Sequence, residues 1–196
     1  MTPREYIAFL QVAGKLKDHT RHSVSARGRE ESVAEHSWRT ALMAMLLAGE
    51  ADGVDLPKVV QMCILHDLGE AVTGDIPSFE KTQADALREH AALFRLLDKL
   101  PEPLSTQWRA LFLEMEQQQT PEAKLYKALD KLEAVLQHNE APLSSWIALE
   151  YDLNQRYGLA EAAQTLPFIQ AVRALAVEDT LQKIQMESKE QITEDR

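Results

Sequence analysis

The feature that most constrains the fold is an apolar run that ends in charged residues. From Val59 to Leu65 almost every residue is apolar, and His66 and Asp67 follow directly. Such a run predicts a helix buried on most sides, and burying an imidazole and a carboxylate at its end is costly unless something compensates their polarity. A divalent metal would do so. The alternative is a core histidine that donates to a backbone carbonyl beside a capping aspartate, which is the favoured explanation for an isolated His-Asp pair.

Two further acids follow this pair closely. Glu70 lies four residues after His66 and three after Asp67, so on a helix it projects over the same face, within reach of a water held by a metal there. Gly74 then permits a turn, and Asp75 emerges close by. The segment therefore brings one imidazole and three carboxylates into one region.

Two ligand candidates elsewhere in the chain favour the metal. His36 lies in the first turns of a second predicted helix, and Asp130 lies in the middle of a third, next to an apolar stripe. Taken alone, Asp130 is equally well explained as a surface aspartate that pairs with Lys127 or Lys131. Taken with the His-Asp pair, these residues make a mixed nitrogen and oxygen site that suits a borderline divalent ion such as Mn²⁺, Co²⁺, Fe²⁺ or Zn²⁺.

Apolar residues recur every three or four positions along most of the chain, which predicts an all-α helical bundle in one domain. Thr2 and Ser32 each open a capping box. We expect Trp38 and Leu42 to form a buried stripe, and no segment resembles a convincing strand. The predicted helices span residues 3–17, 32–51, 55–67, 82–100, 104–118, 121–136, 145–156 and 165–186, and residues 187–196 form a charged tail that is expected to fray.

Length, charge and cysteine content limit the class of protein. A chain of 196 residues builds one substantial core and is short for two domains. The formal net charge of −10 argues against nucleic-acid polymers and anionic membranes as partners, because both are bound by basic surfaces. The single cysteine, Cys63, excludes an intramolecular disulfide and a cysteine-based zinc cluster. Without a membrane-spanning run of ~20 apolar residues or a secretory signal, the protein is expected to be cytoplasmic.

The order of His, His-Asp and Asp on separate helices resembles the signature of the HD-domain metal-dependent phosphohydrolases. Two longer strings, residues 29–36 (REESVAEH) and 66–77 (HDLGEAVTGDIP), are similar to the corresponding segments of the bacterial YfbR-like 5′-deoxynucleotidases. The resemblance implies a single HD-type domain over residues 1–196. Its metal-site core would take up about 30–136, and the C-terminal helices, about 144–190, would pack on that core.

The resemblance also implies a role for each matched residue. Glu70 would orient or deprotonate the attacking water and assist proton transfer to the leaving oxygen. Asp75 would help to position the substrate through a sugar hydroxyl, or share the proton transfer. Arg21, spaced from His36 as the family's phosphate-binding arginine is, would hold the 5′-phosphate. One divalent metal ion (Co, Mn, Zn, Fe or similar) would be bound by His36, His66, Asp67 and Asp130.

The chain departs from the family pattern at one position. Directly after that arginine the family commonly has a tryptophan, which lies near the sugar and is associated with preference for deoxyribose, whereas this chain has His22. An imidazole donates and accepts hydrogen bonds, while an indole mainly presents a face. His22 is therefore expected to bind substrate, but strict selectivity for deoxyribonucleotides is not implied.

The resemblance implies a metal-dependent phosphomonoesterase that converts nucleoside 5′-monophosphates, with deoxynucleotides foremost, to nucleoside and phosphate. Some HD-fold proteins are di-iron oxygenases, but these need two further histidines before the last aspartate, where this chain has only His90. Alarmone hydrolases typically carry a Glu-Asp pair shortly after His-Asp, where this chain has only Glu70. HD domains also serve as non-catalytic sensing or docking modules, usually after loss of a ligand or of the general base.

The expected partner is a small nucleoside monophosphate, and the family implies a homodimer. Exposed apolar positions on the later helices, such as Trp146, would be compatible with a dimer. Core packing is nevertheless the more common fate of any one such residue.

Overall fold

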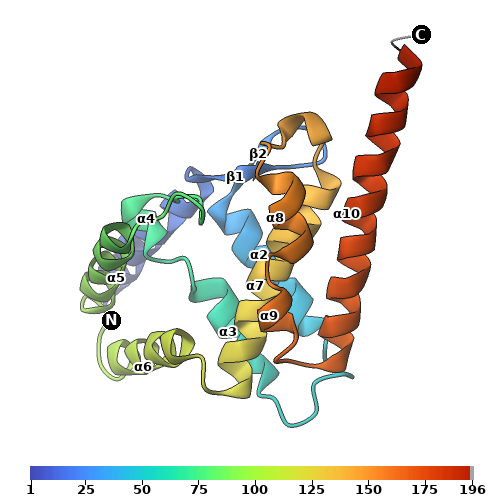
Figure 1. Ribbon diagram of the computed structural model, residues 1–196. Helices are drawn as coiled ribbons and strands as arrows, with labels where there is room; N and C mark the ends of the chain where they lie inside the picture. The colour runs from blue at the N-terminus through green and yellow to red at the C-terminus, as the bar shows by residue number, and fades with distance from the viewer. Residues whose placement is uncertain (195–196) are drawn as a thin grey trace.

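The computed structural model describes residues 1–194 and shows a helical bundle with a small two-stranded sheet (Figure 1). The predicted all-α class is confirmed. Two 3-10 helices, η1 and η2, follow α1 and α7. The elements in chain order are α1 (Pro3–Ala13), η1 (Gly14–Lys17), β1 (Thr20–Val24), β2 (Glu30–Ser32), α2 (Val33–Met45), α3 (Leu56–Leu65), α4 (Glu70–Thr73), α5 (Gln83–Leu97), α6 (Leu104–Gln117), α7 (Pro121–Glu140), η2 (Leu143–Ser145), α8 (Glu150–Arg156), α9 (Leu159–Ala162) and α10 (Pro167–Glu194).

Helix α7 is the axis on which the bundle packs (Figure 1). Its buried face is a leucine stripe, in which Leu125, Leu129 and Leu132 are each at most 1% exposed. Helices α2 and α3 pack on each other and on α7, and α6, α9 and α10 also contact α7. Side chains from α2, α3 and α7 therefore meet in a common interior.

The predicted capping boxes at the starts of α1 and α2 are both formed. The hydroxyls of Thr2 and Ser32 accept from the backbone N–H groups of Glu5 and Glu35, whose carboxylates accept in return from the cap backbone. A cap of this kind stabilises a helix by ~1 kcal/mol. At α2 it also fixes where the helix begins, and hence the position of His36 one turn later.

The prediction of no strand was wrong for the segment before α2. There β1 pairs antiparallel with β2, with Thr20 opposite Ser32 and Val24 opposite Glu30. Three residues of β1 lie between these pairs, against the single residue Glu31 of β2, so β1 is bulged. The segment has no apolar alternation, and therefore it carries no strand signal. At a bulge, successive side chains need not face opposite sides of the strand.

The His-Asp pair does not continue the helix that precedes it. Helix α3 ends at Leu65 with His66 as its C-cap residue, and α4 begins only at Glu70. The backbone tightens between them, because the N–H groups of Leu68 and Glu70 donate to the carbonyl oxygens three residues earlier, each at 2.9 Å. Glu70 therefore lies on a separate short helix, and the prediction that it extends the helical face of His66 was wrong.

Two glycines allow α4 to sit where it does. Gly74 has φ +77°, which ends α4 and turns the chain into Asp75. A Cβ atom on Gly69 would lie 3.0 Å from Cγ of Glu89 and 3.3 Å from its carbonyl oxygen. A side chain at Gly69 would therefore push α5 away from α4.

The expected buried stripe on α2 was also wrong. Trp38 and Leu42 are 61% and 38% exposed. The buried face of the helix instead carries small residues, among them Ala41 and Ala44, which suit the close packing of α2 on α3. Trp146, in contrast, is only 8% exposed, in agreement with its expected place in the core.

The C-terminal boundaries differ from those predicted. In place of a helix over 145–156, the chain forms η2 and then α8, and the unpredicted α9 precedes α10. Helix α10 runs to Glu194 and not to residue 186. The sequence predicts that residues 187–196 fray. The side chains of these residues, and residues 195–196 as a whole, lie outside the described residues, so this stays a prediction. No helix in the described part of the chain is both long and apolar enough to cross a membrane.

Candidate active site

Four side chains from three helical segments meet beside α7, and we call them the tetrad: His36, His66, Asp67 and Asp130. Nε2 of His36 lies 3.2 Å from Nε2 of His66 and 3.1 Å from Oδ1 of Asp130. Nε2 of His66 lies 3.0 Å from Oδ2 of Asp67. The structure thus brings together all four ligand candidates that the sequence indicated.

The other ring nitrogens of both histidines are already engaged. Nδ1 of His36 lies 2.5 Å from Oε2 of the buried Glu133, and Nδ1 of His66 donates to the carbonyl oxygen of Cys63 at 2.9 Å. If each Nδ1 carries the proton of a neutral ring, both Nε2 atoms present lone pairs to each other and to two carboxylates. Lone pairs and carboxylate oxygens that face one another in this way repel unless a cation lies among them. The tetrad therefore fits a divalent cation, and its histidines have the acceptors behind them that metal-binding histidines usually have.

The electrostatic environment of the tetrad also favours positive charge. Burial by itself lowers the pKa of His66, but the charges of Asp67 and Asp130 outweigh burial and raise this pKa to about 10. Burial raises the pKa of Asp130, yet Lys127 and the two histidines hold it well below its ordinary value. The tetrad thus attracts protons, which a divalent cation would displace on binding.

Asp130 serves two partners, one with each oxygen. Its Oδ2 lies 2.7 Å from Nζ of Lys127, one helical turn away on α7. Its Oδ1 faces His36 instead. The pairing with Lys127 that the sequence left open is therefore present, and it leaves one oxygen directed into the tetrad.

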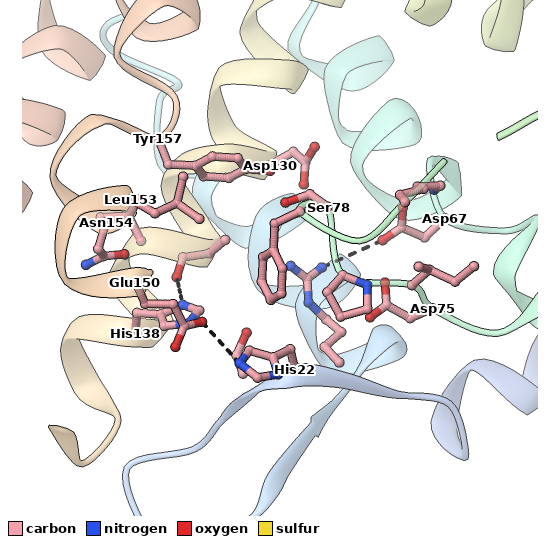
Figure 2. A pocket seen from close by; sticks show the side chains of 18 of the residues that line it. His22, Asp67, Asp75, Ser78, Asp130, His138, Glu150, Leu153, Asn154 and Tyr157 are labelled. Atoms are coloured by element: carbon pink, nitrogen blue, oxygen red, sulfur yellow. Dashed lines mark hydrogen bonds and ion pairs between the residues drawn. The ribbon is translucent and has the colours of Figure 1, made fainter. Parts of the chain in front are cut away.

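A cavity of about 180 Å³ opens beside the tetrad (Figure 2). In Figure 2, Asp67 and Asp75 lie at one end of this cavity, and His138, Glu150 and Asn154 lie at the other. The cavity therefore has two chemically different ends. Other side chains that line it include Arg21, His22, Glu70, Phe79, Lys127 and Tyr157.

Arg21 projects from the bulge of β1 toward the tetrad. Its Nη1 lies 3.8 Å from Oδ2 of Asp67, and its Nε lies 3.4 Å from Oε2 of the buried Glu31. Burial opposes the charge of Arg21, but Asp67 and Glu133 outweigh burial and raise its pKa. Burial and the charge of Glu133 raise the pKa of Glu31 to about 7. A permanent cation is thus held between the tetrad and the cavity.

Glu70 and Asp75 line the cavity from α4 and from the turn after it. Glu70 is 4% exposed, and its Oε2 has no hydrogen-bond partner within the described residues. Burial and the charges of Asp67 and Asp75 raise the pKa of Glu70 to about 10. Burial also raises the pKa of Asp75, against the opposing effect of Arg21. Both acids therefore bind protons more tightly than ordinary carboxylates.

Toward the opposite end of the cavity, four residues are joined by contacts, and we call them the distal cluster: His22, Phe79, His138 and Glu150. Oε1 of Glu150 lies 2.7 Å from Nε2 of His138 and 3.2 Å from Nε2 of His22 (Figure 2). The ring of His22 lies edge-on to Phe79, with 5.5 Å between the ring centroids. His22, for which the sequence predicted substrate binding, is therefore held by residues that the sequence did not indicate.

Sequence reasoning missed several supporting residues of the site. Glu133 lies three residues after Asp130, so helical spacing places both on one face, and an acid beside a leucine stripe is a signal that would have found it. Glu31, His138 and Glu150 carry no such local signal. Their positions depend on how β2, the end of α7 and α8 pack together.

His90 does not join the tetrad. Its ring stacks on Phe94, with 4.3 Å between centroids, and its Nε2 lies 3.2 Å from Oε1 of Glu116. It lines a second cavity of about 450 Å³, which also reaches Asp67. His90 is the only histidine between Asp67 and Asp130, so this part of the sequence lacks the pair of additional histidines that a di-iron centre requires.

The chain is similar to known proteins both in sequence and in structure. The sequence profile of the HD domain matches residues 13–170. The human 5′-deoxynucleotidase HDDC2 is 34% identical over 145 residues, which cover 70% of this chain and 68% of that protein. The protein of the same name from Xenopus laevis is 33% identical over 160 residues, covering 79% and 74%. The crystal structure of a predicted metal-dependent phosphohydrolase from Magnetospirillum magnetotacticum MS-1 has a TM-score of 0.79 at 28% identity, covering 92% of this chain and 95% of that one.

Proposed function

The chain belongs to the HD-domain family of phosphohydrolases, and from this premise we propose that it hydrolyses nucleoside 5′-monophosphates to nucleoside and phosphate. The observation that carries the proposal is the tetrad, whose four lone-pair donors converge within hydrogen-bonding distances beside a cavity that Arg21 also lines. The relatives named 5′-deoxynucleotidases support the choice of substrate class.

We propose that one divalent cation is held by the tetrad. When bound there, such a cation supplies Lewis acidity, which polarises a phosphoryl oxygen and makes water easier to deprotonate. The nitrogen and oxygen donor set suits Mn²⁺, Co²⁺, Fe²⁺ or Zn²⁺. Glu133 and the carbonyl oxygen of Cys63 support this assignment, because they keep the two histidines in the tautomer that leaves Nε2 free.

Residues of the protein bind the substrate and transfer the proton. Arg21 binds the non-bridging oxygens of the 5′-phosphate and orients the phosphorus for in-line attack by water. Glu70 accepts a proton from the attacking water as the new P–O bond forms, and returns it to O5′ as the P–O5′ bond breaks. Glu70 gives up its tightly held proton more readily beside a divalent cation, because the added positive charge offsets the repulsion from Asp67. Asp75 accepts a hydrogen bond from a sugar hydroxyl.

Two other readings of an HD fold have less support. A di-iron oxygenase is disfavoured because it needs two further histidines, whereas only His90 lies between Asp67 and Asp130 and its Nε2 pairs with Glu116. A non-catalytic module would be expected to have lost a ligand or the general base. Here all four members of the tetrad and Glu70 are present, and Glu70 lines the same cavity as Asp67 and Asp130.

We also propose that the protein forms a homodimer through the exposed face of α2. Four apolar side chains on this helix and directly after it are at least 38% exposed, and their helical spacing groups them on one face, as at interaction sites. Size-exclusion chromatography with light scattering would report twice the mass of one chain, and Trp38→Glu would reduce that mass to one chain. The residues concerned are Trp38, Leu42, Met45 and Leu46.

The proposed function is tested by phosphate release from a panel of nucleoside 5′-monophosphates, with Mn²⁺, Co²⁺, Zn²⁺, Fe²⁺ or Mg²⁺ supplied to chelator-treated protein. We expect release with at least one metal and none with chelator present. Asp130→Asn should abolish release, while Glu140→Gln, a carboxylate-to-amide change on the exposed side of α7, should not. Nucleotide binding without release under every metal would support the non-catalytic reading instead.

A further inference from the structure

The distal cluster contains a histidine whose two nitrogens both face acceptors. Nδ1 of His138 lies 2.9 Å from the carbonyl oxygen of Ala134, and its Nε2 lies 2.7 Å from Oε1 of Glu150. A neutral imidazole donates from only one nitrogen, so this ring carries both protons and a positive charge. Burial opposes that charge, but the bonds to Glu150 and Ala134 raise the pKa of His138. His138 and Glu150 are therefore an ion pair.

Glu150 is fixed in place through both of its oxygens. Oε1 accepts from His138, Oε2 accepts from the backbone N–H of Ile147 at 2.8 Å, and the residue is only 3% exposed. Helix α8, which begins at Glu150, is itself tied to α10, because the buried guanidinium of Arg173 donates to the carbonyl oxygen of Asn154 at 3.0 Å. The carboxylate is therefore a rigid acceptor at the edge of the cavity.

This carboxylate lies against the ring of His22. Nε2 of His22 lies 3.2 Å from Oε1 of Glu150, and contact with Phe79 limits rotation of the ring. Neither ring nitrogen of His22 has a hydrogen-bond partner within residues 1–186, and a neutral imidazole has one nitrogen that accepts. The side chain is 34% exposed and lines the cavity. His22 thus offers the cavity a hydrogen-bond acceptor.

The position of this acceptor relates it to the sugar of a nucleotide. His22 directly follows Arg21, and the bulge of β1 allows both side chains to line one cavity. With the 5′-phosphate on Arg21, the group bonded next to the phosphate is the sugar, which comes to lie beside His22. Asp75 is a second acceptor on the same cavity. A ribose carries two adjacent hydroxyl donors, which match two acceptors, whereas a deoxyribose leaves one acceptor without a partner.

We propose that Glu150, held by protonated His138, positions His22 so that its imidazole accepts a hydrogen bond from the 2′-hydroxyl of the substrate, and that ribonucleoside 5′-monophosphates are substrates at least as good as their deoxy counterparts. The proposal rests on the proposed function and specifies the sugar for the same site. Here His22 contacts the substrate, while Glu150 and His138 are positioning residues.

The test is the ratio of kcat/KM for matched pairs, AMP with dAMP, GMP with dGMP and CMP with dCMP. We expect a ratio of one or more for the unaltered protein. In His22→Phe and in Glu150→Gln the ratio should fall about three- to tenfold, mainly through KM for the ribonucleotide, as loss of one hydrogen bond predicts. Because both substrates meet the same preparation, partial unfolding or metal loss cancels in the ratio.

Glu140→Gln is the matched control, since it makes the same change of charge on an exposed residue of α7 that pairs with Arg39 outside the cavity. Its ratio should equal that of the unaltered protein. A ratio below one in the unaltered protein would overturn the proposal, and so would a ratio that neither His22→Phe nor Glu150→Gln changes. In both cases deoxynucleotides would still be hydrolysed, whereas failure of the proposed function would show as no phosphate release from either member of a pair.

Discussion

The tetrad and the distal cluster occupy opposite ends of one cavity but are built in different ways. Each member of the tetrad lies on, or at the end of, a helix of the core around α7, and the acceptor behind each histidine comes from that same core. The distal cluster is assembled from the bulge of β1, the segment after α4, the end of α7 and the start of α8.

With the proposed roles of the two ends, this difference would make chemistry and selectivity separable in the molecule. The tetrad depends on close helix packing, so any change there acts on the core. The distal cluster depends on segments that pack onto the core, and it can change without moving the tetrad. Variants of the first kind should therefore alter metal binding or turnover but not the preference among substrates, and variants of the second kind should do the reverse.

The largest effect is expected for Glu70→Gln. Loss of the proton acceptor should lower kcat by about 10²–10⁴-fold, because general base catalysis typically contributes that much. Metal content, measured by inductively coupled plasma mass spectrometry, should stay at the level of the unaltered protein. If the metal is lost together with activity, Glu70 is a ligand, and its assignment as the base is wrong.

Arg21→Ala should have the next largest effect. Removing a charged partner of the phosphate should raise KM about 10- to 100-fold, while kcat falls less. Initial rates over a range of nucleotide concentrations separate the two constants. An unchanged KM would place the phosphate elsewhere in the cavity.

Glu133→Gln probes the support behind the tetrad. The amide is a weaker acceptor for Nδ1 of His36, so metal affinity should fall about 10- to 100-fold, as it does when such supporting acceptors are lost elsewhere. Isothermal titration with Mn²⁺ measures this change, and the ratio of ribonucleotide to deoxynucleotide turnover should stay the same. A shift in that ratio would show that the two ends are coupled.

The smallest effect is expected at the distal cluster, in the pH dependence of stability. The pKa of His138 is raised in the folded protein by Glu150, so its protonated ring stabilises the fold fully below the unfolded value of about 6.5, and this contribution is lost as pH rises through the higher folded pKa. His138→Gln should therefore cost about 1 kcal/mol of unfolding free energy at pH 6 and less at pH 9. Urea denaturation at both pH values measures it. An equal or larger cost at pH 9 would contradict the ion pair with Glu150.

Local pattern was enough to indicate the helical class and the tetrad. Thr2 and Ser32 mark helix starts through side-chain to backbone bonds within three residues, and these need no knowledge of the rest of the fold. His36 follows the capping box that opens α2, Asp130 stands beside the leucine stripe of α7, and the pair at the end of α3 is a charged end to an apolar run. Such features depend on neighbours in sequence.

Features that depend on tertiary contacts could not be predicted from the sequence. Trp38 follows the apolar period of α2, yet close packing on α3 selects the face with small residues and leaves the indole exposed. The bulged strand β1 is held by its pairing with β2 and not by apolar alternation. Glu150 is an acid in a polar stretch until α8 brings it to His138 and His22.

The proposed hydrolysis depends on the binding of one divalent cation by the tetrad. The most direct measurement is the Mn²⁺ stoichiometry of chelator-treated and reloaded protein, by isothermal titration, with circular dichroism to show that the fold is kept. We predict one equivalent per chain, and for Asp130→Asn an affinity at least about tenfold weaker with unchanged helical content. If folded protein binds no Mn²⁺, Co²⁺, Fe²⁺ or Zn²⁺, or if Asp130→Asn binds as tightly as the unaltered protein, the tetrad is not a metal site.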